Sequence, residues 1–199
     1  MAHQIDYLFA PQSPWTYLGH ARFVQMALAA GAQVRVMPVD LGRVFPVSGG
    51  LPLGQRPAQR RAYRLVELKR FSDFLQLPMN IEPKYFPVAA DDAARLIIAA
   101  DLVEGAAAAL KLAGAVFSAV WAQQRNIADA GVLGELLSET GLPHALLEQS
   151  RAPAAQERYD AYTQDAIERQ VFGAPTYFVD GEMFWGQDRL DFVQRKLQS

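Results

Sequence analysis

A serine–proline pair marks the first place in the sequence where chemistry is expected. Ser13 and Pro14 stand between a short apolar run, residues 5–10, and a helical pattern. Serine is a preferred N-cap and proline suits the first helical turn, so a cap is the simpler interpretation of Ser13. A helix N-terminus also favours negative charge, and a hydroxyl there can donate a hydrogen bond to a thiolate from another molecule. We keep both roles for Ser13.

A second set of candidate binding groups lies near the C-terminus, in the run VFGAPTYFVDGEMFWGQDRL. Gly186, Gln187, Asp188 and Arg189 open the last expected helix and supply amide donors, a carboxylate and a guanidinium group. Such a mixed set suits a small peptide that carries both an α-amino group and carboxylates. The simpler interpretations are an N-cap for Asp188 and a surface salt bridge for Arg189.

The composition excludes several other kinds of chemistry. The chain contains no cysteine, which rules out disulfide exchange by its own side chains, structural disulfides and thiolate metal sites. Its three histidines, His3, His20 and His144, are scattered, so we expect no metal site. Ser13 lacks a Gly-x-Ser-x-Gly context, which disfavours a serine hydrolase.

Size and charge indicate a globular protein without the basic character of a nucleic-acid binder. The 199 residues carry a formal charge of -2, and the basic run Arg56, Arg60, Arg61 and Arg64 is interpreted first as a solvated helix face and second as an anion site. We therefore expect no nucleic-acid partner. The apolar tract at 93–122 is interrupted by charged residues, and no basic leader precedes an apolar stretch, so we expect a cytoplasmic protein without a membrane span.

The elements that must position these groups alternate in type. Residues 5–10 predict a buried strand, a helix follows up to Gly31, and residues 34–39 predict a second strand, parallel to the first. A long loop rich in glycine and proline is expected from Gly42 to Pro57, and such loops are usually functional or mobile. About a hundred residues with helical patterns come next.

The C-terminal pattern returns to strands. Residues 176–180 and 182–185 predict a hairpin around Asp180-Gly181, and a short helix closes the chain. The order of elements is thioredoxin topology with a helical insertion, an α/β fold. We predict that residues 1–57 and 166–199 form the thioredoxin-like domain and that residues 58–165 form the inserted helical domain.

Thioredoxin topology relates the two candidate regions to each other. Redox-active members carry Cys-x-x-Cys at the turn where this chain has residues 13–16, Ser-Pro-Trp-Thr. The Gly-Ala-Pro-Thr run at 173–176 is where such proteins keep a cis-proline opposite that turn, and Ala174 can offer backbone groups to an extended peptide. We therefore predict an enzyme that borrows a thiol from glutathione.

The sequence resembles the 2-hydroxychromene-2-carboxylate isomerase family, a DsbA-like thioredoxin group related to kappa-class glutathione transferases. SPWTYLG matches the family's Ser-Pro-x-x-Tyr-Leu segment, and residues 158–189 match its late segment, in which Phe-Trp-Gly-x-Asp-Arg is specific. The resemblance covers nearly the whole chain. It implies a DsbA/kappa-type sheet with a large helical insertion, and a homodimer is expected.

The resemblance also implies roles for individual residues. Ser13 is the catalytic serine that contacts the glutathione sulfur, and Ala174 pairs with the tripeptide backbone beside cis-Pro175. The residues expected at the γ-glutamyl end are Gly186, Gln187, Asp188 and Arg189. The residues expected to contact a small aromatic substrate are Gln55, Arg56 and Tyr85. Family members often have a lysine near Phe45 and an asparagine near Gly50, and this chain has neither. Arg60 or Arg61 could supply the missing positive charge.

The implied reaction is a cis–trans isomerisation without net redox change. The glutathione thiolate adds to a conjugated carbon, the resulting single bond rotates, and the thiol is eliminated. The substrate would be 2-hydroxychromene-2-carboxylate or a related aromatic catabolite, as in naphthalene degradation, and the product trans-o-hydroxybenzylidenepyruvate. The enzyme must keep the sulfur ionised and stabilise the developing enolate.

Two alternatives remain open. A kappa-like glutathione transferase or peroxidase would share the glutathione residues but would retain the thioether or reduce a peroxide. A redox-silent DsbA-like module would hold peptides along the cis-proline groove. The pair Asp188 and Arg189 argues against the module, since a general peptide binder needs no γ-glutamyl contacts.

Overall fold

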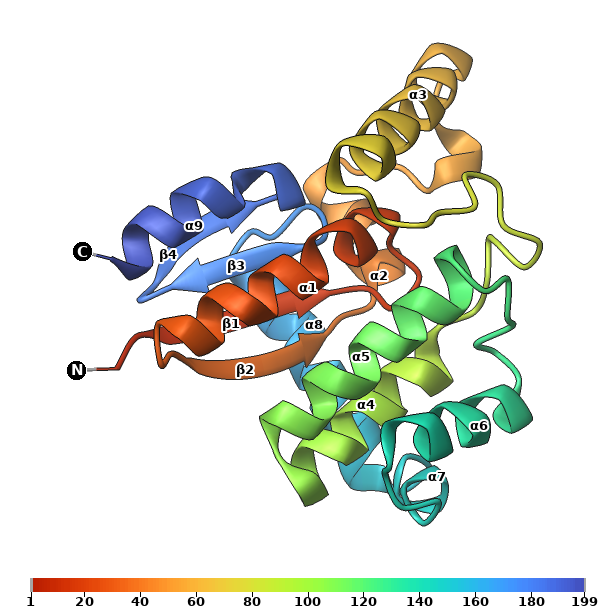
Figure 1. Ribbon diagram of the computed structural model, residues 1–199, viewed down its shortest axis with the longest axis vertical. Coiled ribbons are helices and arrows are strands. Elements are labelled where there is room, and N and C mark those ends of the chain that lie inside the picture. Colours follow the sequence, from red (N-terminus) through yellow and green to blue (C-terminus); the bar gives the residue numbers. More distant parts are fainter. Residues whose placement is uncertain (1, 199) are drawn as a thin grey trace.

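The computed structural model describes residues 2–198 and contains a four-stranded mixed sheet. Its strands are β1 (Gln4–Phe9), β2 (Gln33–Pro38), β3 (Thr176–Val179) and β4 (Glu182–Trp185), in the order β2-β1-β3-β4. β1 is parallel to β2 and antiparallel to β3, and β3 is antiparallel to β4. The two ends of the chain therefore build one sheet, as predicted (Figure 1).

Helices connect and cover the strands. α1 (Pro14–Ala29) joins β1 to β2, and η2 (Gln187–Arg189) leads into α9 (Leu190–Leu197) at the C-terminus. The elements between β2 and β3 are α2 (Leu41–Ser48), η1 (Leu53–Gln55), α3 (Ala58–Leu75), α4 (Asp91–Glu104), α5 (Ala106–Trp121), α6 (Ala130–Thr140), α7 (Leu146–Gln149) and α8 (Pro153–Glu168). The structure therefore has the predicted thioredoxin-like sheet with a large helical insertion.

The sheet is covered on both faces because alternate side chains of a strand point to opposite sides. Ile5, Tyr7 and Phe9 of β1 are buried in one cluster with residues of α1, α5 and α9. Leu8 and Phe178 belong to a second cluster, which includes residues of α2 and α8. Because the first cluster also contains residues of α4 and α6, the helical insertion and the sheet share a continuous core.

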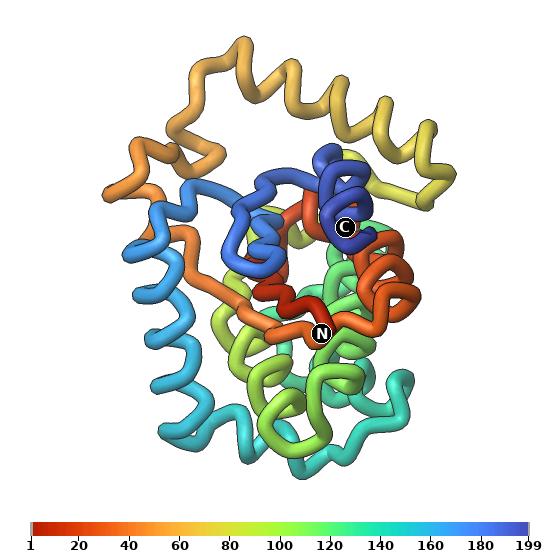
Figure 2. Tube along the Cα trace, turned by 90° about the vertical axis from the view of Figure 1, so that its left-hand side faces the viewer, coloured from red at the N-terminus to blue at the C-terminus, as the bar shows by residue number. Residues whose placement is uncertain are grey.

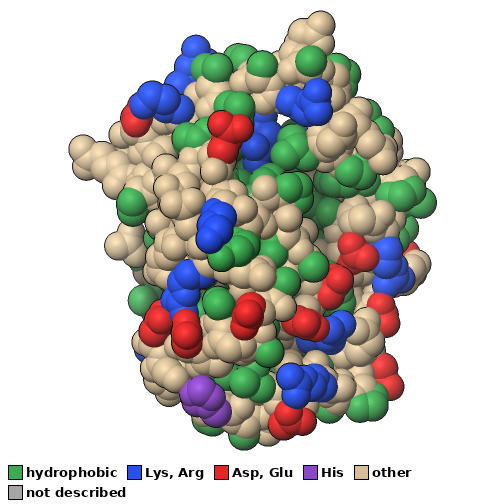
Figure 3. All heavy atoms as spheres, turned by 90° about the vertical axis from the view of Figure 1, so that its right-hand side faces the viewer, with side chains coloured by type: hydrophobic (Ala, Val, Ile, Leu, Met, Phe, Trp, Pro, Cys, Tyr) green, Lys and Arg blue, Asp and Glu red, His purple; other side chains and the backbone are tan. Residues whose placement is uncertain are grey.

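The apolar tract at 93–122 forms most of α4 and α5, and its alanines allow the two helices to pack closely. Within residues 2–198, none of the helices combines the length and the apolar character that crossing a bilayer requires. On the face that includes α5 and α6, acidic and basic side chains are interspersed over the lower half (Figure 3). That face has no continuous basic stripe of the kind that follows a nucleic-acid backbone.

The loop prediction for 42–57 is wrong in its first half, because residues Leu41–Ser48 form α2. Asp40 caps this helix by accepting a hydrogen bond from the Gly42 amide at 2.7 Å, and Gly49 ends it with a φ of 74°. Val44 is buried, and Arg43 pairs with Asp160 of α8. These caps and tertiary contacts keep the segment helical despite Pro46, whose ring removes one helical N–H donor.

His20 lies on the buried side of α1, where it connects α1 to the sheet and to α5. Its Nε2 is 3.0 Å from the carbonyl oxygen of Leu110, which can only accept, so Nε2 donates and Nδ1 accepts from the Tyr7 hydroxyl at 3.1 Å. The ring also contacts Phe117 edge to face. Burial lowers the pKa of His20 to about 4, against an ordinary 6.5. The imidazole is therefore neutral in the folded protein at pH 7.

The lowered pKa predicts a loss of stability in acid. Between pH 6.5 and about 4 the unfolded chain binds a proton at His20 that the folded chain does not. The free energy of unfolding therefore decreases as the pH is lowered through this interval. Over this whole interval the free energy of unfolding should decrease by about 3 kcal/mol. Urea unfolding at pH 7 and pH 4.5 should show that acid lowers the stability of His20→Gln less than that of wild type. Glutamine can donate and accept hydrogen bonds at this position without titrating. His144→Gln, on an exposed position, should behave as wild type. Equal acid sensitivity of His20→Gln and wild type would contradict the prediction.

Candidate active site

Two adjoining hollows lie between α3 and the segment from β3 to η2, with volumes of about 750 Å³ and 360 Å³. α3 crosses one end of the molecule, and the C-terminal segment lies on its inner side (Figure 2). The residues that line both hollows are Trp15, Phe45, Arg56, Arg64, Phe172, Ala174 and Trp185. A ligand that spans the shared wall could therefore contact the N-terminal turn, α3 and the C-terminal segment together.

Ser13 lines the smaller hollow and is 8% exposed. It is the N-cap of α1, where Pro14 takes the first helical position, and its Oγ accepts a hydrogen bond from the Thr16 amide at 3.3 Å. The predicted cap is confirmed. Since the hydroxyl oxygen is the acceptor in this bond, the hydroxyl proton stays available to a ligand in the hollow. The cap and the predicted thiolate contact are therefore compatible.

The peptide bond between Ala174 and Pro175 is cis, as predicted. Ala174 lines both hollows, and within residues 2–198 its backbone N–H and C=O make no hydrogen bond to the protein. The Pro175 carbonyl is engaged, because it accepts a hydrogen bond from the Gly186 amide at 2.9 Å. Ala174 thus presents free main-chain groups to an extended ligand, as strand addition requires.

The predicted γ-glutamyl residues Gly186, Gln187, Asp188 and Arg189 all line the larger hollow. The Gly186 amide is already used by Pro175, so this predicted donor is not free. Gln187 is buried and its Nε2 has no hydrogen-bond partner among the described residues. Asp188 and Arg189 pair with each other at 2.5 Å.

These groups fit glutathione. An unpartnered buried amide donor is costly, and a ligand carboxylate at Gln187 would satisfy it. The carboxylate of Asp188 suits the α-amino group, and Arg189 has further donors for a carboxylate. Ala174 and Ser13 line the hollows where the tripeptide backbone and the sulfur would lie.

Among the predicted substrate residues, only Arg56 reaches the hollows. Gln55 and Tyr85 line neither hollow, and the structure does not place them at the site as the resemblance implies. Gln55 is exposed in η1. Tyr85 is turned outward because the next residue, Phe86, packs against Trp121 with ring centroids 4.8 Å apart. Phe86 therefore occupies the wall where Tyr85 was expected.

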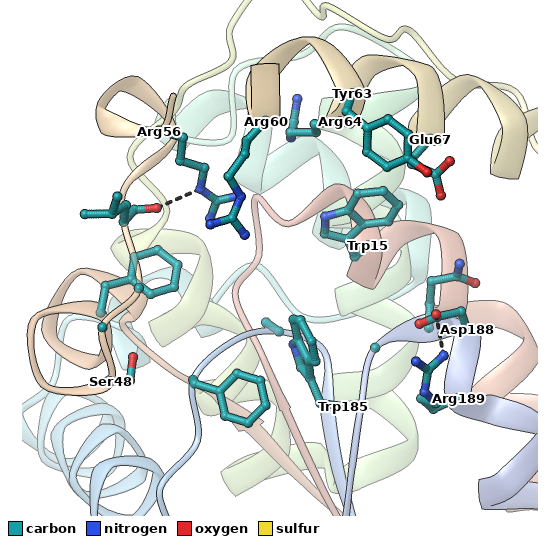
Figure 4. Close-up of a pocket in the computed structure, with 18 of the residues that line it drawn as sticks. Trp15, Ser48, Arg56, Arg60, Tyr63, Arg64, Glu67, Trp185, Asp188 and Arg189 are labelled. Atoms are coloured by element: carbon teal, nitrogen blue, oxygen red, sulfur yellow. Dashed lines mark hydrogen bonds and ion pairs between the residues drawn. The ribbon is translucent and has the colours of Figure 1, made fainter. Parts of the chain in front are cut away.

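Three arginines of the basic run line the hollows, which is compatible with the second interpretation of the run as an anion site. Arg60 lines the larger hollow and Arg64 lines both, whereas Arg61 lines neither. Arg56, Arg60 and Arg64 form no ion pair within residues 2–198, while the carboxylates of Glu67 and Asp188 in the same hollow are paired with other arginines. Figure 4 shows Arg56 and Arg60 on the α3 side and Trp185, Asp188 and Arg189 opposite.

Burial and neighbouring positive charges lower the pKa values of two arginines at this site. Burial, and next the proximity of Arg56, lower the pKa of Arg64 to about 10. Burial and then Arg60 lower the pKa of Arg56. A bound anion would relieve this repulsion. The sequence analysis named Arg64 only as a member of the basic run, although Arg60 and Arg64 are four residues apart and therefore share a helix face.

Aromatic rings form the rest of the wall that the two hollows share. The sequence analysis did not assign these residues to the site. Phe172 and Trp185 contact each other with centroids 4.7 Å apart, and Trp15 packs edge to face on Phe71 of α3. Gly173 allows the Phe172–Trp185 contact, because a Cβ there would lie 2.5 Å from the Trp185 indole nitrogen. Such walls suit a planar aromatic ligand.

The fold and the site define a protein of the thioredoxin-like class, and comparison with known proteins agrees. Residues 4–198 match the DSBA-like thioredoxin domain, and the chain belongs to this family. It is 34% identical over 194 residues to 2-hydroxychromene-2-carboxylate isomerase from Pseudomonas putida, covering 96% of this chain and 92% of that protein. These findings confirm the predicted family and the prediction that the chain is an isomerase.

Two further relatives extend the comparison. A solved structure of 2-hydroxychromene-2-carboxylate isomerase superimposes with a TM-score of 0.79 at 29% identity, covering 98% of this chain and 94% of that chain. Glutathione S-transferase kappa 1 from Caenorhabditis elegans is 23% identical over 206 residues, covering 98% of this chain and 91% of that protein. Both span nearly the full length of this chain.

Proposed function

We propose that this protein isomerises 2-hydroxychromene-2-carboxylate, or a closely related aromatic catabolite, to trans-o-hydroxybenzylidenepyruvate with the help of glutathione. One observation carries the proposal: the capping hydroxyl of Ser13, the free backbone of Ala174 and three unpaired arginines meet at two connected hollows. The first two groups suit a thiol-bearing peptide, and the arginines suit a small anion. The similarity to the Pseudomonas putida enzyme supports this substrate.

In this proposal the residues of the two hollows bind different parts of glutathione and of the substrate. Bound glutathione supplies a thiolate that adds reversibly to a conjugated double bond. The Ser13 hydroxyl donates to the sulfur position and the N-terminus of α1 adds positive potential, so ionised sulfur is favoured over the thiol. Gln187, Asp188 and Arg189 hold the γ-glutamyl end in the larger hollow. The aromatic walls exclude water and keep the ring of the substrate next to Ser13.

The similarity to a kappa-class glutathione transferase supports the cofactor. Transferase or peroxidase activity would use the same Ser13 and Ala174 but needs no arginine cluster. The unpaired arginines therefore favour the isomerase with its carboxylate substrate. We further propose that the protein is a cytoplasmic homodimer and that it acts in aromatic hydrocarbon breakdown, such as naphthalene degradation.

Following the absorbance of hydroxychromene carboxylate tests the proposal. The purified protein should accelerate conversion to the trans product only when glutathione is present, and the glutathione should be recovered unchanged. A stable thioether product would instead identify a transferase. No conversion with glutathione present would refute the proposed reaction.

Substitution of Asp188 should weaken glutathione binding without changing the fold. Asp188→Ala removes a charged acceptor from the expected α-amino contact, and the loss should be about 1–3 kcal/mol in calorimetry. Asp191→Ala is a suitable control, because this exposed carboxylate on α9 lies outside both hollows and pairs with Arg22. Unchanged affinity in Asp188→Ala would remove Asp188 from the cofactor site.

A further inference from the structure

Arg64 of α3 is a half-buried cation of the site, whereas Arg60 on the same helix is exposed. Within residues 2–198 its guanidinium makes neither an ion pair nor a hydrogen bond, although the side chain is half-buried. Arg56, by comparison, donates from Nε to the Leu51 carbonyl oxygen at 2.8 Å. Five N–H donors without a protein acceptor are costly in a partly buried position. A ligand that accepts from them would remove this cost.

Aromatic rings hold Arg64 in place. Its guanidinium carbon lies 5.3 Å from the centroid of Phe86 and 5.7 Å from that of Trp121, both cation–π distances. These contacts to the rings leave the guanidinium N–H groups without an acceptor within residues 2–198. The group is thus oriented before a ligand arrives, which lowers the entropy lost on binding.

The smaller hollow determines what kind of ligand Arg64 meets. Besides Arg64 and Ser13, its wall contains apolar residues such as Phe86 and Val88 and the polar side chains of Gln12 and Arg56, and none of the described residues that line it is a carboxylate. None of the residues from Gly186 to Arg189, which suit the γ-glutamyl end of glutathione, lines this hollow. The free cation therefore faces an apolar chamber beside the catalytic serine, where an aromatic ring with one anionic group would fit.

We infer that Arg64 binds the carboxylate of the aromatic substrate through its N–H edges and thereby orients the ring next to Ser13. This inference rests on the proposed function for the identity of the ligand. It assigns to Arg64 the positive charge expected from Arg60 or Arg61. Arg61 lines neither hollow, and Arg60 lines only the larger one. A guanidinium can bind a carboxylate with two parallel hydrogen bonds, which fixes the plane of the ligand.

Binding of two matched probes to the protein without glutathione tests this inference. The probes are trans-2-hydroxycinnamate and its neutral amide, which share ring and length and differ in charge. Wild type should bind the anion about tenfold or more tightly than the amide, as expected for charged hydrogen bonds. Arg64→Met, which keeps an unbranched apolar stem beside the two rings, should abolish the preference. Arg61→Met, one residue along α3, should retain it.

Further measurements separate this inference from the proposed reaction. Glutathione affinity should be unchanged in Arg64→Met, and a circular dichroism spectrum should show that the fold is intact. If Arg64→Met does not fold, Arg64→Lys should fold and keep part of the preference, because it retains the charge but not the bidentate fork. Retention of the full preference in Arg64→Met, or loss of glutathione affinity with the preference intact, would overturn the inference. An Arg64-dependent preference in a protein that fails to isomerise would support it and refute the reaction alone.

Discussion

Replacement of Ser13 by alanine should lower the turnover of the glutathione-dependent isomerisation by about 100- to 1000-fold, the usual effect of losing one preorganised donor to a developing or ionised centre. The hydroxyl lies at the N-terminus of α1, is nearly buried and has its proton free toward the smaller hollow. In the proposed complex it would stabilise charged sulfur more than the neutral thiol. Ser13→Ala should therefore also raise the pKa of bound glutathione, which an ultraviolet thiolate titration of the complex would show.

The cap role of Ser13 needs a matched control. Loss of an N-cap alone should cost about 1 kcal/mol of stability and leave the thiol pKa unchanged. Asp129 caps α6, where it accepts hydrogen bonds from the amides of Gly131 and Val132, and it lines neither hollow. Asp129→Ala should therefore reproduce the loss of stability but not the loss of turnover. Identical thiolate titrations of wild type and Ser13→Ala would leave Ser13 as a cap only.

Truncation of Trp121 should have the largest effect on stability. This fully buried side chain contacts Phe86 and the guanidinium of Arg64, so it supports the wall of the smaller hollow from behind. Trp121→Ala should cost about 3–5 kcal/mol in urea unfolding, through lost burial and the cavity left behind. Its indole nitrogen has no partner among the described residues, so removing that donor offsets part of the cost. The value should fall toward the lower end of this range.

Two further variants provide comparisons for the stability loss expected in Trp121→Ala. Trp121→Phe keeps a ring in the core and removes the unpartnered nitrogen, so its loss of stability should be clearly smaller than that of Trp121→Ala. Leu28→Ala, at a side chain that is 80% exposed on α1, should change stability by no more than about 0.5 kcal/mol. A loss below 1 kcal/mol in Trp121→Ala would mean that neighbouring side chains repack into the space.

Local patterns in the sequence determined the elements that carry the glutathione side of the site. The cis bond before Pro175 was predicted from thioredoxin topology. The Ser13–Pro14 pair is a helix start with a direct chemical cause, the short apolar runs at both ends predict strands, and the Asp180-Gly181 pair predicts a tight turn. These features depend on neighbours in the chain, so the amino-acid order alone is sufficient to predict them.

The substrate side was decided by tertiary structure. Whether Tyr85 or Phe86 faces the hollow depends on the packing of the connector against Trp121, which lies 35 residues or more away in the sequence. The start of the predicted loop is the helix α2 because Arg43 and Val44 find partners in α8 and the core. The basic run contained Arg64, but only the packed structure separates Arg64, which lines both hollows, from Arg61, which lines neither. Short motifs encode backbone conformation, whereas the partners of a long side chain depend on how distant elements pack, and that is why the sequence predicted the cofactor side better than the substrate side.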